Sequence, residues 1–305
     1  INAVIPILIV PYYSVIGGWV VKYLCEYLLG HSHALASDDY FSGFISDGAS
    51  TELAFLAFAL LTLGIIFAGV ENGVERFSKV TMPVLVVLSV IITIYSVTRP
   101  GAMAGVKYFL VPNPENFSWM TVVSAMGQMF YSLSIAMGIL ITFGSYMKRD
   151  IAIEDSTQNV EFFDTLIAMM AGLMIIPAVF AFSGGDSASL NAGPSLMFIT
   201  LPKVFDSMGF GSAVGVLFFL LVQFAAVTSS IALTESAVST FQDELGWSRK
   251  TSTCLMAVIL VALGTLSSLG YGPLSGVTIL GMQFLDFFDF LTNSVMMPIA
   301  AIATC

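Results

Sequence analysis

The sequence is dominated by apolar stretches that are each long enough to cross a lipid bilayer and are separated by polar connections. A membrane-spanning helix needs about 20 predominantly apolar residues. Because backbone groups in hydrocarbon must satisfy their own hydrogen bonds, each stretch is predicted to be helical. The fold class predicted is an all-α polytopic membrane bundle, and residues 1–305 form a single transmembrane domain. The stretches lie at roughly 1–30, 51–70, 80–98, 119–146, 160–183, 212–241, 252–270 and 287–305, which gives about eight helices.

The composition of the chain excludes a soluble globular protein. Charged residues make up 10% of the chain and hydrophobic residues 57%, whereas a soluble domain carries about 25% charged residues. A formal charge of −10 without a basic patch does not suggest a nucleic-acid partner. Cys25, Cys254 and Cys305 lie too far apart for a disulfide framework or a metal site. His31 and His33 are interpreted as ordinary loop residues, and no nucleophile–base pair suggests an enzyme.

The chain begins at Ile1 and stops at Cys305, in both cases inside an apolar run. We therefore expect an internal segment of a longer protein.

Cations gather in alternate connections. Residues 75–79, 147–150 and 248–250 are rich in Lys and Arg, whereas 31–50 has neither. The positive-inside rule predicts that the first set is cytoplasmic and that the acidic 31–50 loop is outside. The long connection 184–211 has an apolar middle that suggests short helices dipping toward the bundle. A lid and a packed re-entrant connection are both open at this point.

Four carboxylates fall in or beside apolar stretches: Asp164, Glu235, Asp286 and Asp289. A charged side chain at a helix centre costs roughly 2.5–3.5 kcal/mol on insertion scales. No cation is close in sequence to Asp164 or Asp289. A bound cation, or an arginine from another segment, would balance them.

A cluster of hydroxyl groups follows in "QFAAVTSSIALTE". Ala225, Thr228 and Ser229 share one helix face at i, i+3, i+4 spacing. Their oxygens, with the carbonyl of Ala225, would suit a hard cation such as sodium. The alternative is that Thr228 and Ser229 bond back to carbonyls one turn earlier.

The stretch "GQMFYSLSIAMG" (127–138) places Ser132 and Ser134 two residues apart. In a regular helix these side chains point to nearly opposite sides. A discontinuous helix would let both face one site, and Ala136 and Gly138 would ease the break. Transporters use such broken helices at the bilayer midplane to bind anionic groups and ions. The alternative is a continuous helix with small residues at packing contacts.

A tyrosine pair lies in mid-span in "PYYSVIGGW" (11–19). Gly17 and Gly18 would let another helix approach closely. Tyr12 and Tyr13 each need a hydrogen-bond partner, and a substrate carboxylate is one candidate. Simple packing of the pair is the alternative.

The order of "PYYSVIGGW", "GVERFSKVTMP", "GQMFYSLSIAMG…SYMKRD", "FAAVTSSIA", "DELGWSRK" and "FLDFFDF" resembles the neurotransmitter:sodium symporters, especially their bacterial amino-acid transporters. The resemblance implies the leucine-transporter fold, with two inverted five-helix repeats around a mid-membrane substrate. The chain would run from the third to the tenth of the family's twelve helices, without the first two and last two.

The resemblance also implies roles for individual residues. The implied substrate-binding residues are Ile9, Tyr13, Tyr131, Ser132, Ser134, Met137, Ser229 and Leu233. Two sodium sites are implied, with ligands from Ser132 and Asp164 in the first and from Ala225, Thr228 and Ser229 in the second. The implied gate residues are Tyr13, Tyr131 and Asp289 on the outer side and Tyr146 on the inner side.

The resemblance leads to two further expectations, one for Asp164, which departs from the family pattern, and one for the pair Gly73 and Pro83. Asp164, followed one turn later by Ala168, would supply the negative charge that chloride brings in animal members, so chloride is not expected as a cofactor. Gly73 and Pro83 resemble a bacterial pattern linked to helix unwinding that opens a water path. The alternative for this pair is a plain helix start with Pro83 near its first turn.

The function predicted is a sodium-coupled symporter of neutral, hydrophobic or aromatic L-amino acids that works by alternating access. Its place would be the plasma membrane, as a multi-pass protein of a bacterial inner membrane. The alternatives are a truncated bundle that does not transport and a transporter or channel of the same fold for another small solute.

Overall fold

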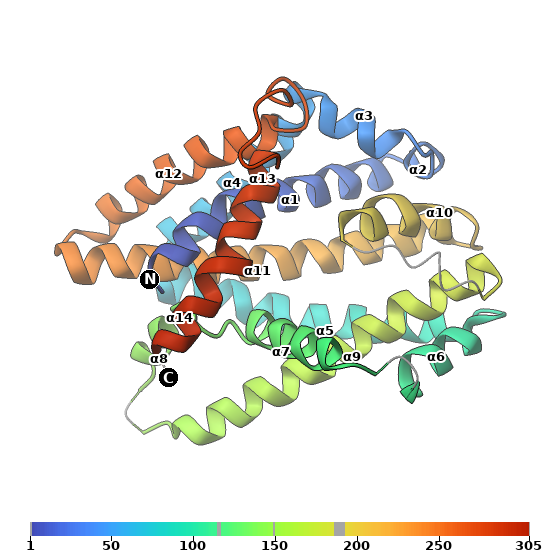
Figure 1. Cartoon of the computed structure of the whole chain (residues 1–305), viewed down its shortest axis with the longest axis horizontal. Helices are drawn as coiled ribbons and strands as arrows, with labels where there is room; N and C mark the ends of the chain where they lie inside the picture. The colour runs from blue at the N-terminus through green and yellow to red at the C-terminus, as the bar shows by residue number, and fades with distance from the viewer. Residues whose placement is uncertain (1, 115–116, 149, 186–192, 305) are drawn as a thin grey trace.

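The protein is a bundle of long helices in the computed structural model, which describes residues 2–114, 117–148, 150–185 and 193–304 (Figure 1). Within these ranges every regular element is helical. In chain order the elements are α1 (Val4–Leu28), α2 (Ser32–Leu35), α3 (Tyr40–Ser46), α4 (Gly48–Phe67), the π-helical η1 (Val70–Glu75), α5 (Arg76–Val97), α6 (Ala102–Leu110), α7 (Trp119–Ser132), α8 (Ile139–Ser145), α9 (Ile153–Ser183), the π-helical η4 (Leu196–Thr200), α10 (Leu201–Asp206), α11 (Gly211–Leu245), α12 (Arg249–Leu269), α13 (Phe284–Asp289), the π-helical η5 (Phe290–Met296) and α14 (Met297–Thr304).

Seven helices in the described part of the chain are long and apolar enough to cross a membrane. The fourth predicted stretch, 119–146, is divided into α7 and α8, which explains the difference from the predicted number of eight. The span predicted at 80–98 begins earlier, at Val70, because the π-helical η1 continues directly into α5. Pro83 therefore lies inside α5, and the alternative that it marks a helix start is wrong. Residues 73–83 are helical throughout in this structure.

The helix α1 lies at the centre of the bundle and packs against α4, α11 and α12. Its approach to α4 depends on two glycines. A Cβ atom on Gly18 would lie 2.6 Å from the backbone nitrogen of Phe55, and one on Gly17 would lie 2.5 Å from the ring of Phe58. Any larger residue would therefore push the two helices apart, so the close approach predicted from "IGGW" is confirmed.

An aromatic cluster anchors the 184–211 connection to the bundle. The ring of Phe198 in η4 stacks on Phe41 with centroids 5.2 Å apart and meets Trp19 edge-on at 5.8 Å. The phenol of Tyr23 donates to the carbonyl of Phe198 over 2.8 Å. The predicted short helices are present as η4 and α10. Their buried side chains match the packed re-entrant alternative for this connection.

The three cation-rich segments lie at one end of the bundle, although 75–79, predicted as a connection, is helical because η1 continues into α5. Val70, Tyr146 and Arg249, which border these connections, line one cavity together. The helices α2, α6 and α10 lie at the opposite end (Figure 1). This grouping agrees with the predicted alternation of the connections, and the side of the membrane that each end faces stays a prediction.

The two histidines lie at the end that carries α2 and α10. The ring of His31 contacts Glu26 over 2.6 Å, and that of His33 contacts Asp206 of α10 over 2.6 Å. Both therefore tie the start of the 31–50 loop to neighbouring helices. Among the described residues no three His, Cys, Asp or Glu side chains form a group that could hold a metal.

Candidate functional site

The broken helix predicted at 127–138 is confirmed. The helix α7 ends at Ser132, and α8 begins at Ile139. Between them the backbone enters the left-handed region at three alternate residues, with φ of 55° at Ser134, 67° at Ala136 and 75° at Gly138. For residues other than glycine this conformation costs about 1–2 kcal/mol each, so surrounding contacts must hold the break in place. The alternative of a continuous helix is wrong.

The break leaves backbone amides available on one side. The N–H groups of residues 133–135 donate to carbonyls of the last turn of α7. Within the described part of the chain, the N–H groups of residues 136–138 have no acceptor. Unpaired amides at an unwound helix in a membrane protein attract anionic groups.

A cavity of about 410 Å³ opens beside the break. Its walls come from α1, α5, α7, α8, α11 and the break itself. The lining residues are Ile9, Tyr13, Met82, Gln128, Tyr131, Ser132, Ser134, Met137, Ile139, Thr228, Ser229, Ala232 and Leu233. All the residues predicted to bind substrate therefore border the same cavity, which we call the central cavity.

The sequence reasoning missed two polar or flexible lining residues. Gln128 lies four residues before Ser132 and so shares its face of α7. That spacing is a signal that could have identified it. Met82 reaches the cavity from α5, next to Pro83, and no local pattern in the sequence distinguishes it from the other exposed apolar residues of that helix.

The central cavity has a mainly apolar wall, to which α1, α7, the break and α11 add hydroxyl and amide groups. None of its lining residues carries a formal charge. Tyr13 of α1 and Ser229 of α11 both place hydroxyl-bearing side chains on the wall of this cavity. Tyr131 lies within electrostatic range of Tyr13 and of Asp289. A cavity of this size and character is typical of a site for a small, largely apolar ligand.

The residues predicted for the first sodium site lie in contact. The hydroxyl of Ser132, in α7, donates to Oδ1 of Asp164, in α9, over 2.6 Å. Asp164 does not line the central cavity itself and reaches it through Ser132. The pair places a carboxylate and a hydroxyl oxygen at the end of α7, where the helix breaks.

In the group predicted for the second sodium site, the hydroxyl of Thr228 donates to the carbonyls of Phe224 and Ala225 over 3.1 and 3.0 Å. The alternative of a bond to the preceding turn therefore applies to Thr228. Ser229 borders the central cavity, as Tyr13 does. The carbonyl of Ala225 also lies within the continuous helix α11, where it accepts the N–H group four residues on. The oxygens of Ala225 and Thr228 thus lie together on α11, but they are engaged in hydrogen bonds within the helix in this structure.

The side of the central cavity that is predicted to face outward carries two carboxylates with neutral partners. Asp289 accepts a hydrogen bond of 2.6 Å from the amide of Asn293. Asp286 accepts one of 2.8 Å from the phenol of Tyr271. Burial, together with this carboxylate, raises the pKa of Tyr271 above its usual value. No Lys or Arg among the described residues forms an ion pair with Asp289.

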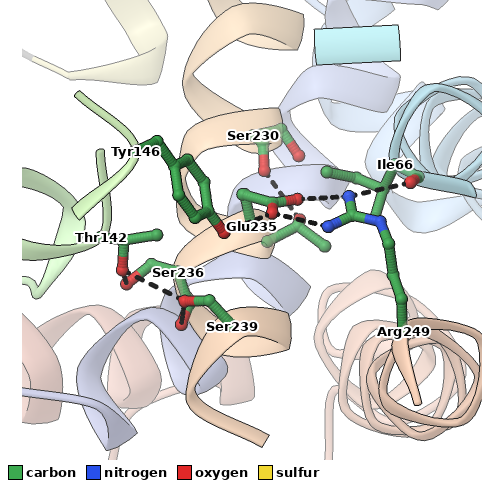
Figure 2. Close-up of polar contacts among 9 residues, drawn as sticks. Ile66, Thr142, Tyr146, Ser230, Glu235, Ser236, Ser239 and Arg249 are labelled. Carbon is green, nitrogen blue, oxygen red and sulfur yellow. Dashed lines mark hydrogen bonds and ion pairs between the residues drawn. The ribbon is translucent and has the colours of Figure 1, made fainter. Parts of the chain in front are cut away.

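The side predicted to face inward carries a buried ion pair (Figure 2). Glu235 of α11 is fully buried and accepts hydrogen bonds from both terminal nitrogens of Arg249, at 2.8 and 2.6 Å. The phenol of Tyr146 donates to the same carboxylate over 2.8 Å. Arg249 also donates to the carbonyl of Ile66 in α4 over 3.0 Å. One carboxylate thus connects α8, α11, α12 and, through Arg249, α4.

Sequence reasoning recognised that Glu235 needs a partner but did not identify it. It assigned Arg249 to a cytoplasmic connection. In the structure Ser248 caps α12, its hydroxyl accepting from the amide of Thr251, so Arg249 becomes the first residue of the helix. Its side chain then points back into the bundle.

The chain matches known proteins over most of its length. The model of the Sodium:neurotransmitter symporter family matches residues 40–305. An uncharacterized sodium-dependent transporter of Bacillus subtilis, YhdH, is 33% identical over 298 residues, which cover 97% of this chain and 65% of the relative. One of Haemophilus influenzae is 31% identical over 303 residues, which cover 96% of this chain and 65% of the relative.

A solved structure is also similar. The crystal structure of MhsT in complex with L-phenylalanine superposes with a TM-score of 0.85 at 36% identity, and the match covers 99% of this chain and 68% of that one. The predicted fold class, an all-α bundle of the leucine-transporter type, is thereby confirmed. The chain spans about 65% of the length of the two curated relatives.

Proposed function

The chain belongs to the sodium:neurotransmitter symporter family, and from this premise we propose that the whole protein is a sodium-coupled symporter of neutral, hydrophobic or aromatic L-amino acids. The observation that carries the proposal is the central cavity, because it gathers apolar walls and hydroxyls beside a helix break. It is a multi-pass membrane protein, and its bacterial relatives favour a bacterial inner membrane.

The substrate class is inferred from the walls of the cavity. An amino acid has a carboxylate that needs donors and a side chain that needs a matching surface. The donors on offer are the phenol of Tyr13 and the unpaired backbone amide of Met137, both of which belong to lining residues. Ile9, Met137 and Leu233 offer an apolar surface without charge, and a methionine adapts to several side-chain sizes. The related MhsT was crystallised with L-phenylalanine.

Sodium is proposed as the coupled ion at two sites. The first uses the hydroxyl of Ser132 and the carboxylate of Asp164, which already touch. The second uses the carbonyl of Ala225 with the hydroxyls of Thr228 and Ser229 on one face of α11. Oxygen donors of this kind suit hard cations. The relatives carry the name sodium-dependent transporter, which supports the same ion.

Chloride is proposed to be unnecessary. A sodium ion beside an uncharged set of ligands needs a compensating anion, whereas Asp164 would supply a fixed negative charge at the break. The carboxylate is held by a hydrogen bond from Ser132 and pairs with no Lys or Arg of the described residues.

The transport cycle is proposed to alternate access to the central cavity. Tyr13 and Tyr131 would close over the substrate on the outer side, with Asp289 near them. Tyr146 and its partner Glu235 would close the inner side. Unwinding of the helical segment between Gly73 and Pro83 would open a water path at the start of α5. Loss of sodium from the Thr228–Ser229 site would accompany release.

The test is uptake by the full-length protein in proteoliposomes. We expect an inward sodium gradient to drive accumulation of labelled L-phenylalanine, and an equal potassium gradient to drive none. Thr228→Ala and Ser229→Ala should raise the sodium concentration for half-maximal uptake by about tenfold each, since each removes an ion ligand.

A matched control is Ser89→Ala, which removes a buried hydroxyl that bonds only within α5. It should leave the sodium dependence unchanged. Uptake that is indifferent to sodium, or an unaltered sodium dependence in both α11 variants, would contradict the proposal.

A further inference from the structure

A second cavity lies on the inner side of the central cavity. Its volume is about 330 Å³, and its lining includes Val70, Gln242, Asp243 and Arg249. The helix α8 borders both cavities. Ile139 lines the central cavity, whereas Ser145 and Tyr146, about two turns later, line this inner cavity. The layer of α8 between them is the turn that contains Thr142.

The helix α11 separates the two cavities at the same level. Ala232 and Leu233 line the central cavity, and Ser239 lines the inner one. The turn between them contains Glu235 and Ser236. Any path from the central to the inner cavity along these helices must therefore pass between α8 and α11 at the level of Thr142 and Ser236.

Three hydroxyls close this layer (Figure 2). The Thr142 hydroxyl donates to that of Ser236 over 3.4 Å and lies 3.2 Å from that of Ser239. The hydroxyl of Ser239 donates a hydrogen bond to the carbonyl of Ser236 over 3.1 Å. It therefore acts as a second acceptor for Thr142. All three side chains are buried, with exposed fractions of 8% for Thr142, 1% for Ser236 and 8% for Ser239.

Ser236 also contacts the end of the helix break. A Cβ atom on Gly138 would lie 3.1 Å from Oγ of Ser236. The same serine thus touches the break that shapes the central cavity and the first turn of α8. Movement of α8 away from α11 would change both contacts together.

We propose that Thr142, Ser236 and Ser239 form a hydroxyl tie that positions α8 against α11 and holds the central cavity closed toward the inner cavity. The inference rests on the proposed transport function, for which these three are positioning residues. The tie is distinct from the ion pair of Glu235 and Arg249. Its members are neutral, so breaking it leaves no buried charge, and water from the inner cavity can replace the lost hydrogen bonds.

The tie therefore sets how easily the inner side opens. A neutral hydrogen bond contributes modestly because water competes for both partners. Removing the shared donor should shift the equilibrium between closed and inward-open forms by about three- to tenfold. The shift should favour the inward-open form.

The experiment measures this opening directly in the full-length protein. Ala232, which lines the central cavity on the far side of the tie, is replaced by cysteine in a background whose other cysteines are replaced by serine. Its labelling rate by a membrane-impermeant thiol reagent is measured from the cytoplasmic side. Thr142→Val, which keeps the side-chain shape, and Ser236→Ala should each raise the rate by about three- to tenfold. Thr142→Ser, which retains the hydroxyl, should restore the parental rate.

The matched control is Thr240→Val. Thr240 lies beside the tie on α11, but its hydroxyl donates to the carbonyl of Ser236 within the same helix. Its removal should leave the labelling rate unchanged. Equal labelling in Thr142→Val and the parent, or an equal increase in Thr240→Val, would overturn the proposal.

Labelling separates this inference from the proposed function, because it reports opening whether or not sodium drives uptake. If uptake is sodium-driven and the labelling rates do not move, the tie is refuted and the symporter stands. If uptake is independent of sodium and the rates still move as expected, the tie stands and the coupling is refuted. Thermal unfolding of each variant checks that the folded fraction is the same.

Discussion

Replacement of Arg249 by methionine should destabilise the protein more than replacement of its partner Glu235 by glutamine. Glu235 is fully buried, whereas the side chain of Arg249 is 24% exposed. Methionine retains the length of the arginine stem but leaves the carboxylate buried with only Tyr146 as a donor. Loss of one partner of a buried pair costs about 3–5 kcal/mol. Glutamine in place of Glu235 leaves a neutral group that still accepts hydrogen bonds, at a cost of about 1–2 kcal/mol.

The double variant distinguishes a charge effect from lost packing. With Glu235→Gln and Arg249→Met combined, no charge stays buried. The loss should therefore be smaller than the sum of the single losses by about 1–3 kcal/mol, the range for coupled neighbours. The assay is reversible thermal unfolding of the full-length protein in detergent micelles, and the quantity measured is the melting temperature. A loss of 3–5 kcal/mol corresponds to a fall on the order of 10 °C.

Two outcomes would refute this reasoning. Single variants that lose the same stability within about 0.5 kcal/mol would show that the carboxylate does not depend on its cation. Additive losses in the double variant would show that the two side chains act separately. Tyr146→Phe is the control for the hydrogen bond alone, and should cost about 1 kcal/mol because it removes a donor without exposing a new buried charge.

Three further substitutions test the packing, the break and the ion site. Gly18→Ala should lower stability by about 1–3 kcal/mol, measured by thermal unfolding, because its Cβ would lie 2.6 Å from a backbone atom of α4. Gly138→Ala should cost about 1–2 kcal/mol and slow uptake, because φ is 75° there; unchanged stability and uptake would contradict the assigned backbone. Asp164→Asn should raise the half-maximal sodium concentration about tenfold or more and make uptake respond to chloride. Uptake that ignores chloride in this variant would refute the charge argument.

Local patterns predicted the helices and the break because both depend on neighbours in sequence. Apolar length identified the spans, and two serines two residues apart indicated that one span could not be a regular helix. Gly17 and Gly18 indicated a close helix contact because glycine has no Cβ atom, so a neighbouring helix can approach its backbone closely. Each of these features is encoded within a few residues.

The features that the sequence did not reveal depend on tertiary contacts. The start of the third span at Val70 was missed because Asn72 and Gly73 disfavour a helix locally, and the charged residues beside them interrupt the apolar run. The structure forms a π-helical turn there, and Gly73 packs so closely on α4 that a Cβ atom would lie 2.1 Å from the carbonyl of Ile65. The partner of Glu235 was missed because Arg249 follows a turn whose direction no local pattern predicts.

The helix α11 explains why the central cavity, the ion pair and the hydroxyl tie belong to one mechanism. It is a single helix of 35 residues, and it presents Thr228 and Ser229, then Leu233, then Glu235 and Ser236 along its length. An unbroken helix anchored on α1 and α4 moves as a unit. The α7–α8 segment, by contrast, changes backbone conformation at three positive φ angles. Relative motion between the two should therefore occur by rotation of α8 about the break, which separates α8 from α11 at Thr142 while Ser132, at the end of α7, stays beside Asp164.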